Sequence, residues 1–176
     1  MGNAVEDKTH PPILLSLSAL TDAGRVRKNN EDSFLLANFD RETAGLKELA
    51  CHTVGPKGSL LAVSDGMGWA EGGELASRST EGAVFQWLSE NWGRKPLVTS
   101  LGAALERSIH MANETVLRKA RENPKLFGMG ATILLAGIVG DRLYLRWVGD
   151  NRCYLFRNNA MARLSEDPSL PAPVQD

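Results

Sequence analysis

The chain has 176 residues, of which 43% are hydrophobic and 23% are charged, the composition of an ordinary globular domain. No apolar run reaches the ~18–20 residues that a membrane span needs, and a net charge of −1 argues against a nucleic-acid binder held by phosphate contacts. The near-neutral sum conceals an asymmetry, because residues 1–88 carry 8 basic and 12 acidic side chains whereas residues 89–176 carry 12 and 9. Composition thus predicts one domain with neither a membrane nor a nucleic acid as its partner.

Three strands are expected in the first part of the chain. Residues 13–20 (ILLSLSAL) mix apolar residues with Ser, and a second strand covers residues 33–37 after a polar turn. Residues 58–64 (GSLLAVS) form a compact apolar run that ends at Asp65-Gly66. Such a run is typical of a buried strand.

Two helices follow. The second begins near Leu101 and ends where Asn123-Pro124 interrupts the helical pattern. Both helices have one apolar face, because their apolar residues recur at helical spacing. These residues are Ala76, Ala83, Val84, Trp87 and Leu88 in the first helix, and Leu101, Ala104, Leu105, Ile109, Ala112 and Val116 in the second.

The remaining elements are expected to form hairpins. Residues 131–139 and 142–148 flank Gly140-Asp141, a strong two-residue turn, and Asn158-Asn159 separates two further short strands. The order of strands, two helices and strands predicts an α+β fold with antiparallel sheets and helices packed on one face. The side chains of the strand over 142–148 alternate between two faces. One face carries Leu143, Leu145 and Trp147 and fits a core; the other carries Arg142, Tyr144 and Arg146.

The ends of the chain and its cysteines bear on the compartment. Residues 1–12 lack the basic stretch and apolar run of a secretory signal, and Cys51 and Cys153 show no disulfide or zinc spacing. We therefore expect a cytoplasmic protein with a flexible segment over residues 1–12 and one folded domain over residues 13–176. Residues 167–176 are Pro-rich and contain no closing element, so we expect the domain to be incomplete at this end.

Three turns at strand ends carry carboxylates, at Glu31-Asp32, Asp65-Gly66 and Gly149-Asp150. Carboxylates gathered from separate turns raise each other's pKa unless a cation lies among them, and an all-oxygen set suits Mg²⁺ or Mn²⁺ better than zinc. The missing Cβ of Gly66 lets its carbonyl approach a metal, and two such ions can activate a water for in-line attack on phosphorus. Arg27, four residues before Glu31, can hold a substrate phosphate with its guanidinium fork.

The same residues also have a simpler interpretation. Asp-Gly pairs are common hairpin turns, and Glu-Asp pairs are usually solvated on the surface. Composition and spacing alone therefore leave two alternatives open, a metal site or three ordinary surface turns.

Four longer strings stand in a fixed order along the chain: TDAGRVRKNNEDS at residues 21–33, LAVSDGMG at 61–68, GMGAT at 128–132 and VGDNRCYLFR at 148–157. A weaker fifth, LSEDPSL, follows at 164–170. In this order and spacing they resemble the motifs of the PPM, or type 2C, family of metal-dependent serine/threonine protein phosphatases, in its bacterial branch. Several motifs in the right order are more specific than any one of them alone.

The resemblance implies a four-layer α-β-β-α sandwich of two antiparallel sheets flanked by helices, with the site at one sheet edge. It implies a metal-dependent protein phosphatase that hydrolyses phosphoserine or phosphothreonine by attack of a metal-activated water, with two Mg²⁺ or Mn²⁺ ions. Its substrate would be a phosphorylated protein made by a Ser/Thr kinase. Arg27 would bind the phosphate of that substrate.

Carried over to this sequence, the resemblance also implies a set of metal ligands. Asp65 would bridge the two ions, and the carbonyl of Gly66 would face one of them. Glu31, supported by Asp32, would complete the ligands of the second ion. Asp150 would bind a third, weaker ion.

Two departures of the chain from the family pattern bear directly on its chemistry; Trp69 and Asn151 are smaller departures from the usual Gly and Ser. After Asp167 its only carboxylate is Asp176, so the two later Asp ligands of the family's first metal are missing and the sandwich is incomplete at the C-terminus. Met67 stands where some members carry a His proposed as general acid, and Met cannot donate a proton. We favour a fragment of a longer phosphatase; the alternatives are a catalytically impaired phosphoprotein-binding or regulatory pseudophosphatase module, and a different metal-dependent phosphoester hydrolase.

Overall fold

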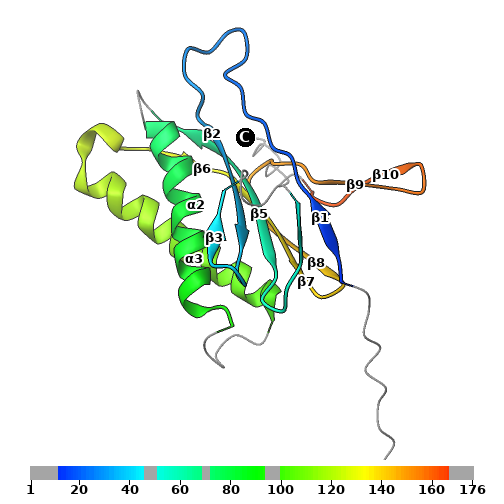
Figure 1. The fold of residues 1–176 in the computed structure, drawn as a ribbon. Helices are drawn as coiled ribbons and strands as arrows, with labels where there is room; N and C mark the ends of the chain where they lie inside the picture. Colours follow the sequence, from blue (N-terminus) through cyan, green and yellow to red (C-terminus); the bar gives the residue numbers. More distant parts are fainter. Residues whose placement is uncertain (1–11, 46–50, 69–71, 94–99, 167–176) are drawn as a thin grey trace, which may run out of the picture.

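The computed structural model describes residues 12–45, 51–68, 72–93 and 100–166 (Figure 1). Most of the predicted flexible segment over 1–12 and the Pro-rich residues 167–176 lie outside the described residues. In chain order the elements are β1 (Leu14–Ser16), β2 (Asp32–Asn38), β3 (Thr43–Ala44), β4 (Cys51–Thr53), β5 (Ser59–Met67), α2 (Gly72–Asn91), α3 (Leu101–Glu122), the 3-10 helix η1 (Pro124–Leu126), β6 (Gly130–Ala131), β7 (Ile133–Val139), β8 (Arg142–Val148), β9 (Tyr154–Arg157) and β10 (Ala160–Arg163).

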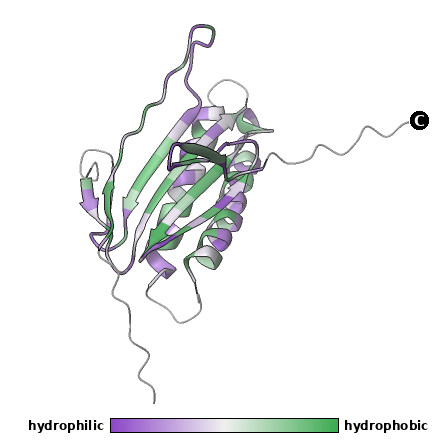
Figure 2. Cartoon of the chain, turned by 90° about the vertical axis from the view of Figure 1, so that its right-hand side faces the viewer, coloured by the Kyte–Doolittle hydropathy of each residue, from purple (hydrophilic) through white to green (hydrophobic). Residues whose placement is uncertain are grey.

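A six-stranded antiparallel sheet forms the centre of the molecule. Its strands lie in the order β3-β2-β5-β7-β8, and β6 pairs with the end of β5. Helices α2 and α3 cover one face of this sheet, and the two-stranded pairs β1–β4 and β9–β10 lie on the other side (Figures 1 and 2). The predicted α+β class, with antiparallel sheets and a helical layer, is confirmed.

The main core lies between the sheet and the two helices. The predicted apolar faces of both helices point into it, because helical spacing places these residues on one side. Each buried Leu or Val adds about 1.5–3 kcal/mol to the stability of the fold. The large side chains that are fully buried here are Leu60 and Leu135 from the sheet, Val84 and Leu88 from α2, and Leu101 and Leu105 from α3.

Local signals define the ends of α3 and the turns of the two hairpins. The Ser100 hydroxyl accepts a hydrogen bond of 3.2 Å from the Ala103 amide and so caps the first turn of α3. Val139 pairs with Arg142 across the predicted Gly140-Asp141 turn. Asn158 and Asn159 have φ values of 53° and 56°, which a two-residue hairpin turn of the I′ type requires at both positions. Both hairpin predictions are confirmed.

The face of β8 that packs against the helices is not the one that its sequence suggests. The polar-looking face points toward the helices, since Tyr144 packs against the main core and Arg146 pairs with Glu106 of α3 at 3.6 Å. Trp147 lies half-buried on the opposite face, where its indole nitrogen donates a hydrogen bond of 3.0 Å to the Glu166 carbonyl.

Several elements differ from the sequence-based expectation. Residues 13–20 hold only the three-residue strand β1, and β3 and β4 are too short to produce a recognisable pattern. Cys51 and Cys153 are both free thiols. In the described part of the chain, neither long helix is apolar enough to cross a bilayer.

Candidate metal and phosphate site

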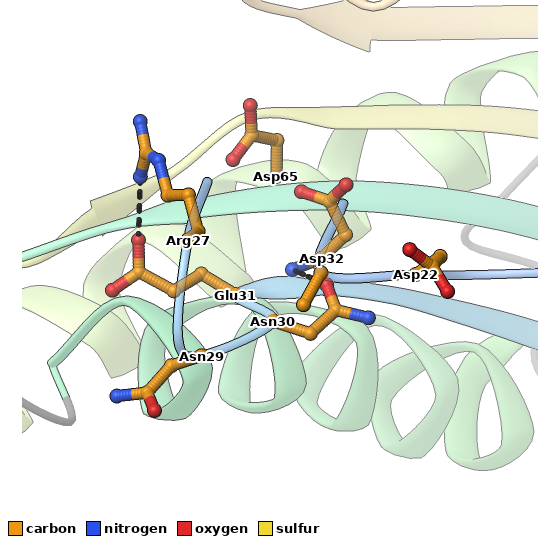
Figure 3. A pocket seen from close by; sticks show the side chains of 8 residues that line it. Asp22, Arg27, Asn29, Asn30, Glu31, Asp32 and Asp65 are labelled. Atoms are coloured by element: carbon orange, nitrogen blue, oxygen red, sulfur yellow. Dashed lines mark hydrogen bonds and ion pairs between the residues drawn. The ribbon is translucent and has the colours of Figure 1, made fainter. Parts of the chain in front are cut away.

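Two strand ends meet at one edge of the central sheet. Because β2 and β5 are antiparallel, Asp32 at the start of β2 lies opposite Asp65 near the end of β5. A cavity of about 230 Å³ opens beside this pair (Figure 3). The side chains that matter for its chemistry are Asp22, Arg27, Asn30, Glu31, Asp32 and Asp65.

Asp65 is held in place through its backbone. Its amide donates a hydrogen bond of 3.0 Å to the Thr132 hydroxyl, and its carbonyl accepts one of 2.8 Å from the Thr132 amide. Asn151 donates to the same hydroxyl at 2.7 Å. Thr132 lies between β6 and β7, so these bonds hold three separate segments of the chain together, those of Asp65, Thr132 and Asn151.

Gly66, the residue after Asp65, lies in close contact with the backbones of Glu31 and Gly73. The Gly66 amide donates a hydrogen bond of 3.1 Å to the Glu31 carbonyl. A Cβ added to Gly66 would overlap the carbonyl oxygen of Gly73, in the first turn of α2. Glycine at this position therefore lets β5, the start of α2 and the loop before β2 come together at the site.

Burial and neighbouring carboxylates together set the electrostatics of the site. The pKa of the Asp65 carboxyl is raised, first by its partial burial and then by the negative charges of Asp32 and Asp150, whereas Arg27 opposes the shift. Arg27 also forms an ion pair of 3.3 Å with Glu31 (Figure 3). The cavity lining thus combines the positively charged side chain of Arg27, on its exposed side, with several carboxylates around Asp65.

The structure brings most of the sequence-predicted site residues to this edge. Arg27, Glu31, Asp32 and Asp65 line one cavity, whereas Asp150 acts on Asp65 only through its charge. Among the residues described, no three His, Cys, Asp or Glu side chains lie close enough together to form a metal-binding group. The donors are all oxygen atoms, which hard divalent cations prefer. Such a cation would offset both the partial burial of the Asp65 carboxylate and the repulsion from Asp32 and Asp150, which together raise the pKa of Asp65.

Sequence reasoning missed three residues that shape the site. Asp22 lines the cavity, and Thr132 and Asn151 hold the backbone of Asp65. All three lie inside the motif strings, but their hydrogen-bonding roles depend on contacts between distant segments. Only the turn chemistry of residues 21–24 signals Asp22 in advance, since its carboxylate accepts a hydrogen bond of 2.7 Å from the Gly24 amide.

Replacing Asp65 with Asn is expected to stabilise the metal-free chain by up to about 1 kcal/mol at pH 7.5. The amide keeps the shape of the side chain and removes a negative charge beside Asp32. This gain corresponds to a rise in melting temperature of about 2–4 °C. Thermal unfolding in the presence of EDTA measures it. A lower melting temperature for the variant would show that Asp65 supports the fold in another way.

Residues 20–170 match the family "Protein phosphatase 2C", and the chain belongs to this family. It is 29% identical over 164 residues to the serine/threonine protein phosphatase PstP of Mycobacterium tuberculosis (strain CDC 1551 / Oshkosh). This alignment covers 93% of the present chain and 27% of PstP. It is 32% identical over 154 residues to the serine/threonine phosphatase stp of Listeria innocua serovar 6a, covering 85% of this chain and 53% of the relative.

Solved structures show the same similarity. The catalytic domain of PstP in complex with two manganese ions superposes with a TM-score of 0.66 at 30% identity, over 89% of this chain and 57% of that chain. A crystal structure of the Mycobacterium tuberculosis enzyme gives a TM-score of 0.62 at 29% identity, over 89% and 54%. The chain therefore spans about half the length of these solved domains, and the predicted family and sandwich fold are confirmed.

Proposed function

We propose that this chain carries the metal- and phosphate-binding part of a serine/threonine protein phosphatase. The observation that carries the proposal is the opposition of Asp32 and Asp65 beside Arg27, at the sheet edge of a chain of the 2C family. The solved PstP domain is described with two manganese ions. This supports Mn²⁺ or Mg²⁺ as the cofactor of the present chain.

The residues assigned to the cation are Asp65 and the Gly66 carbonyl, with Asp32, Glu31 and Asp150 around them. When bound, divalent cations supply the Lewis acid that polarises a phosphate and activates water. The chain's own contribution is to hold Asp65 through Thr132 and to let the start of α2 approach β5 at Gly66. The closeness of the two carboxylates is unfavourable in the free chain, so cation binding is favoured there.

Arg27 is assigned to the phosphate of the substrate. Its side chain is 75% exposed, and its guanidinium lies near both Glu31 and Asp65. Two parallel N–H donors match two phosphate oxygens in a bidentate contact. A phosphate bound here would be oriented toward the carboxylate edge, where water attacks phosphorus and the bond to the Ser or Thr oxygen breaks.

The substrate that follows from this chemistry is a protein carrying phosphoserine or phosphothreonine. Such esters are made by Ser/Thr kinases, so we propose that the protein reverses the action of one. The open, exposed position of Arg27 supports a phosphate presented by a large molecule, since the cavity beside it holds only about 230 Å³.

The experiment that tests the proposal measures release of phosphate from a phosphothreonine peptide by this chain, with and without MnCl₂. Wild-type protein is expected to show turnover that depends on manganese and is lost in Asp65→Asn. Arg27→Ala is expected to raise KM about tenfold or more, because a charge-assisted contact to phosphate is removed. Because Asp65→Asn is expected to be at least as stable as wild type, its loss of activity would not reflect unfolding.

Two results would contradict the proposal. Equal turnover with manganese and with EDTA would exclude metal-dependent chemistry at this edge. Absence of turnover, together with phosphopeptide binding that Arg27→Ala abolishes, would instead identify a phosphoprotein-binding module. Calorimetric titration of Mn²⁺ into wild type and Asp65→Asn separates loss of the cation from loss of the chemistry.

A further inference from the structure

A second cavity, of about 440 Å³, opens on the helix-covered side of the sheet. We call it the α3 cavity, because the second half of α3 forms one wall, and the ends of β5, β6 and β8 form the other. Its floor consists of the buried side chains of Val116, Met129 and Ile133. It is separate from the 230 Å³ cavity beside Asp65, with which it shares no lining residue.

The walls of the α3 cavity expose apolar side chains to solvent. Met67, Leu117 and Val148 are 65%, 43% and 54% exposed, respectively, although each lines the cavity. Large apolar side chains gathered around one hollow mark a binding site more often than single exposed residues do. A Cβ at Gly130 would lie 3.0 Å from the Met67 methyl carbon, so glycine at this position lets the Met67 side chain lie against β6.

The described lining of the α3 cavity favours an uncharged ligand. Its polar members are His110, Asn113 and Thr80, and none of the described residues that line the cavity is an Asp, Glu, Lys or Arg. A carboxylate or ammonium group placed here would lose water without gaining a partner of opposite charge. An uncharged apolar group is therefore the ligand that the cavity accommodates.

Two of the residues that line the α3 cavity lie close in sequence to carboxylates assigned to the metal site. Met67 follows Asp65 by two residues on β5, and Val148 precedes Asp150 by two residues at the end of β8. Two residues of strand span about 6.6 Å. An extended peptide advances by about 3.3–3.6 Å per residue, so two to four residues of a bound peptide are long enough to span the offset between Asp65 and Met67 along β5.

We propose that the α3 cavity binds an apolar side chain, such as Leu or Phe, that lies two to four residues from the phosphorylated residue of the protein substrate. The inference rests on the proposed function, since it assigns substrate selection to a surface beside the same site. Burial of one such side chain is expected to tighten binding of a phosphopeptide about tenfold or more relative to Ser at the same position.

The methionines provide direct probes of this contact. In protein labelled with ¹³C at the methionine methyl groups, Met67 and Met129 report on the α3 cavity, and Met161 on β10 serves as a distant control. Phosphothreonine peptides with Leu scanned from positions −4 to +4, and Ser elsewhere, are titrated in turn. A peptide with Leu in register is expected to shift the Met67 and Met129 signals and leave that of Met161 unchanged.

Two variants on one strand test the affinity. Val148→Asp places a carboxylate at the cavity, whereas Leu143→Asp makes the same change at a site of similar exposure on the opposite face of β8. The preference for the Leu peptide over the all-Ser peptide, measured by fluorescence anisotropy, is expected to vanish in Val148→Asp and to persist in Leu143→Asp. Leu117→Asp, on α3, repeats the test from the other wall.

The results distinguish failure of this inference from failure of the proposed function. Equal affinity for Leu and Ser peptides, with Met67 unshifted, would overturn the inference even if Arg27→Ala weakens both peptides. If no phosphopeptide binds, the proposed phosphate site fails, and an unphosphorylated Leu peptide then tests the cavity alone. Absence of a Met67 shift with that peptide as well would also overturn the inference.

Discussion

Replacing Glu81 with Gln is expected to raise the free energy of unfolding by about 3 kcal/mol at pH 8 and to leave it nearly unchanged at pH 4. Glu81 lies on the face of α2 that packs against the sheet and is only 6% exposed. Its Oε1 atom has no hydrogen-bond partner among the described residues. Burial raises the pKa of this carboxyl to about 7, although the nearby Ser33 hydroxyl and Arg78 act in the opposite direction.

The sign of the effect follows from proton binding. The folded chain holds the proton of Glu81 up to about pH 7, whereas in an unfolded chain the group has its ordinary pKa of 4.5. Between these values the folded state binds more protons, so its stability falls as the pH rises, by about 1.4 kcal/mol per pH unit. The contribution is fully present below pH 4.5 and lost above about pH 7. Gln resembles the protonated form and does not titrate.

Urea unfolding of both proteins from pH 4 to pH 8.5 in EDTA measures this difference. Glu90→Gln is the matched control, because Glu90 lies on the same helix but is exposed and accepts a hydrogen bond from Gln86. The control is expected to change stability by less than about 0.5 kcal/mol. A difference between wild type and Glu81→Gln that does not vary with pH would show that Glu81 ionises in the ordinary range.

Replacing Gly66 with Ala is expected to destabilise the chain by more than about 2 kcal/mol and to weaken Mn²⁺ binding. The added methyl group would overlap the Gly73 carbonyl oxygen. This atom is backbone and cannot move aside as a flexible side chain does. Relief therefore requires that the start of α2 shift away from β5, which also disturbs the Gly66 amide bond to the Glu31 carbonyl.

Gly82→Ala provides the contrasting substitution. Gly82 lies in the interior of α2, is exposed, and has no atom within 4 Å of an added Cβ. Ala restricts the unfolded chain and favours the helix, so a gain of about 0.5–1 kcal/mol is expected. Chemical denaturation of the two variants measures the opposite signs. Equal effects of both changes would refute the close-approach explanation for Gly66.

The sequence predicted the two long helices and the two hairpins well because their signals are local. Apolar residues at helical spacing place Val84 and Leu105 on buried faces whatever the partner is, and Asn158-Asn159 defines its own turn through left-handed backbone angles. The motifs also identified Arg27 and Asp65 as candidate site residues before any contact was known. They could not identify Thr132 as the residue that holds Asp65, because that bond joins segments 67 residues apart.

What the sequence by itself determined is therefore the family, the order of elements and the acidic turns, all of which depend on neighbouring residues or on strings of them. Only the tertiary structure decided which face of β8 lies against the helices. Tyr144 packs its ring, and Arg146 its aliphatic chain, on that face, although both count as polar residues in the sequence pattern. The tertiary structure also decided that the balanced charge of the chain becomes a local excess of carboxylates, since the register of β2 and β5 sets Asp32 opposite Asp65. Strand register and burial arise from contacts between distant segments. Composition gives only the total charge and cannot show where the carboxylates gather.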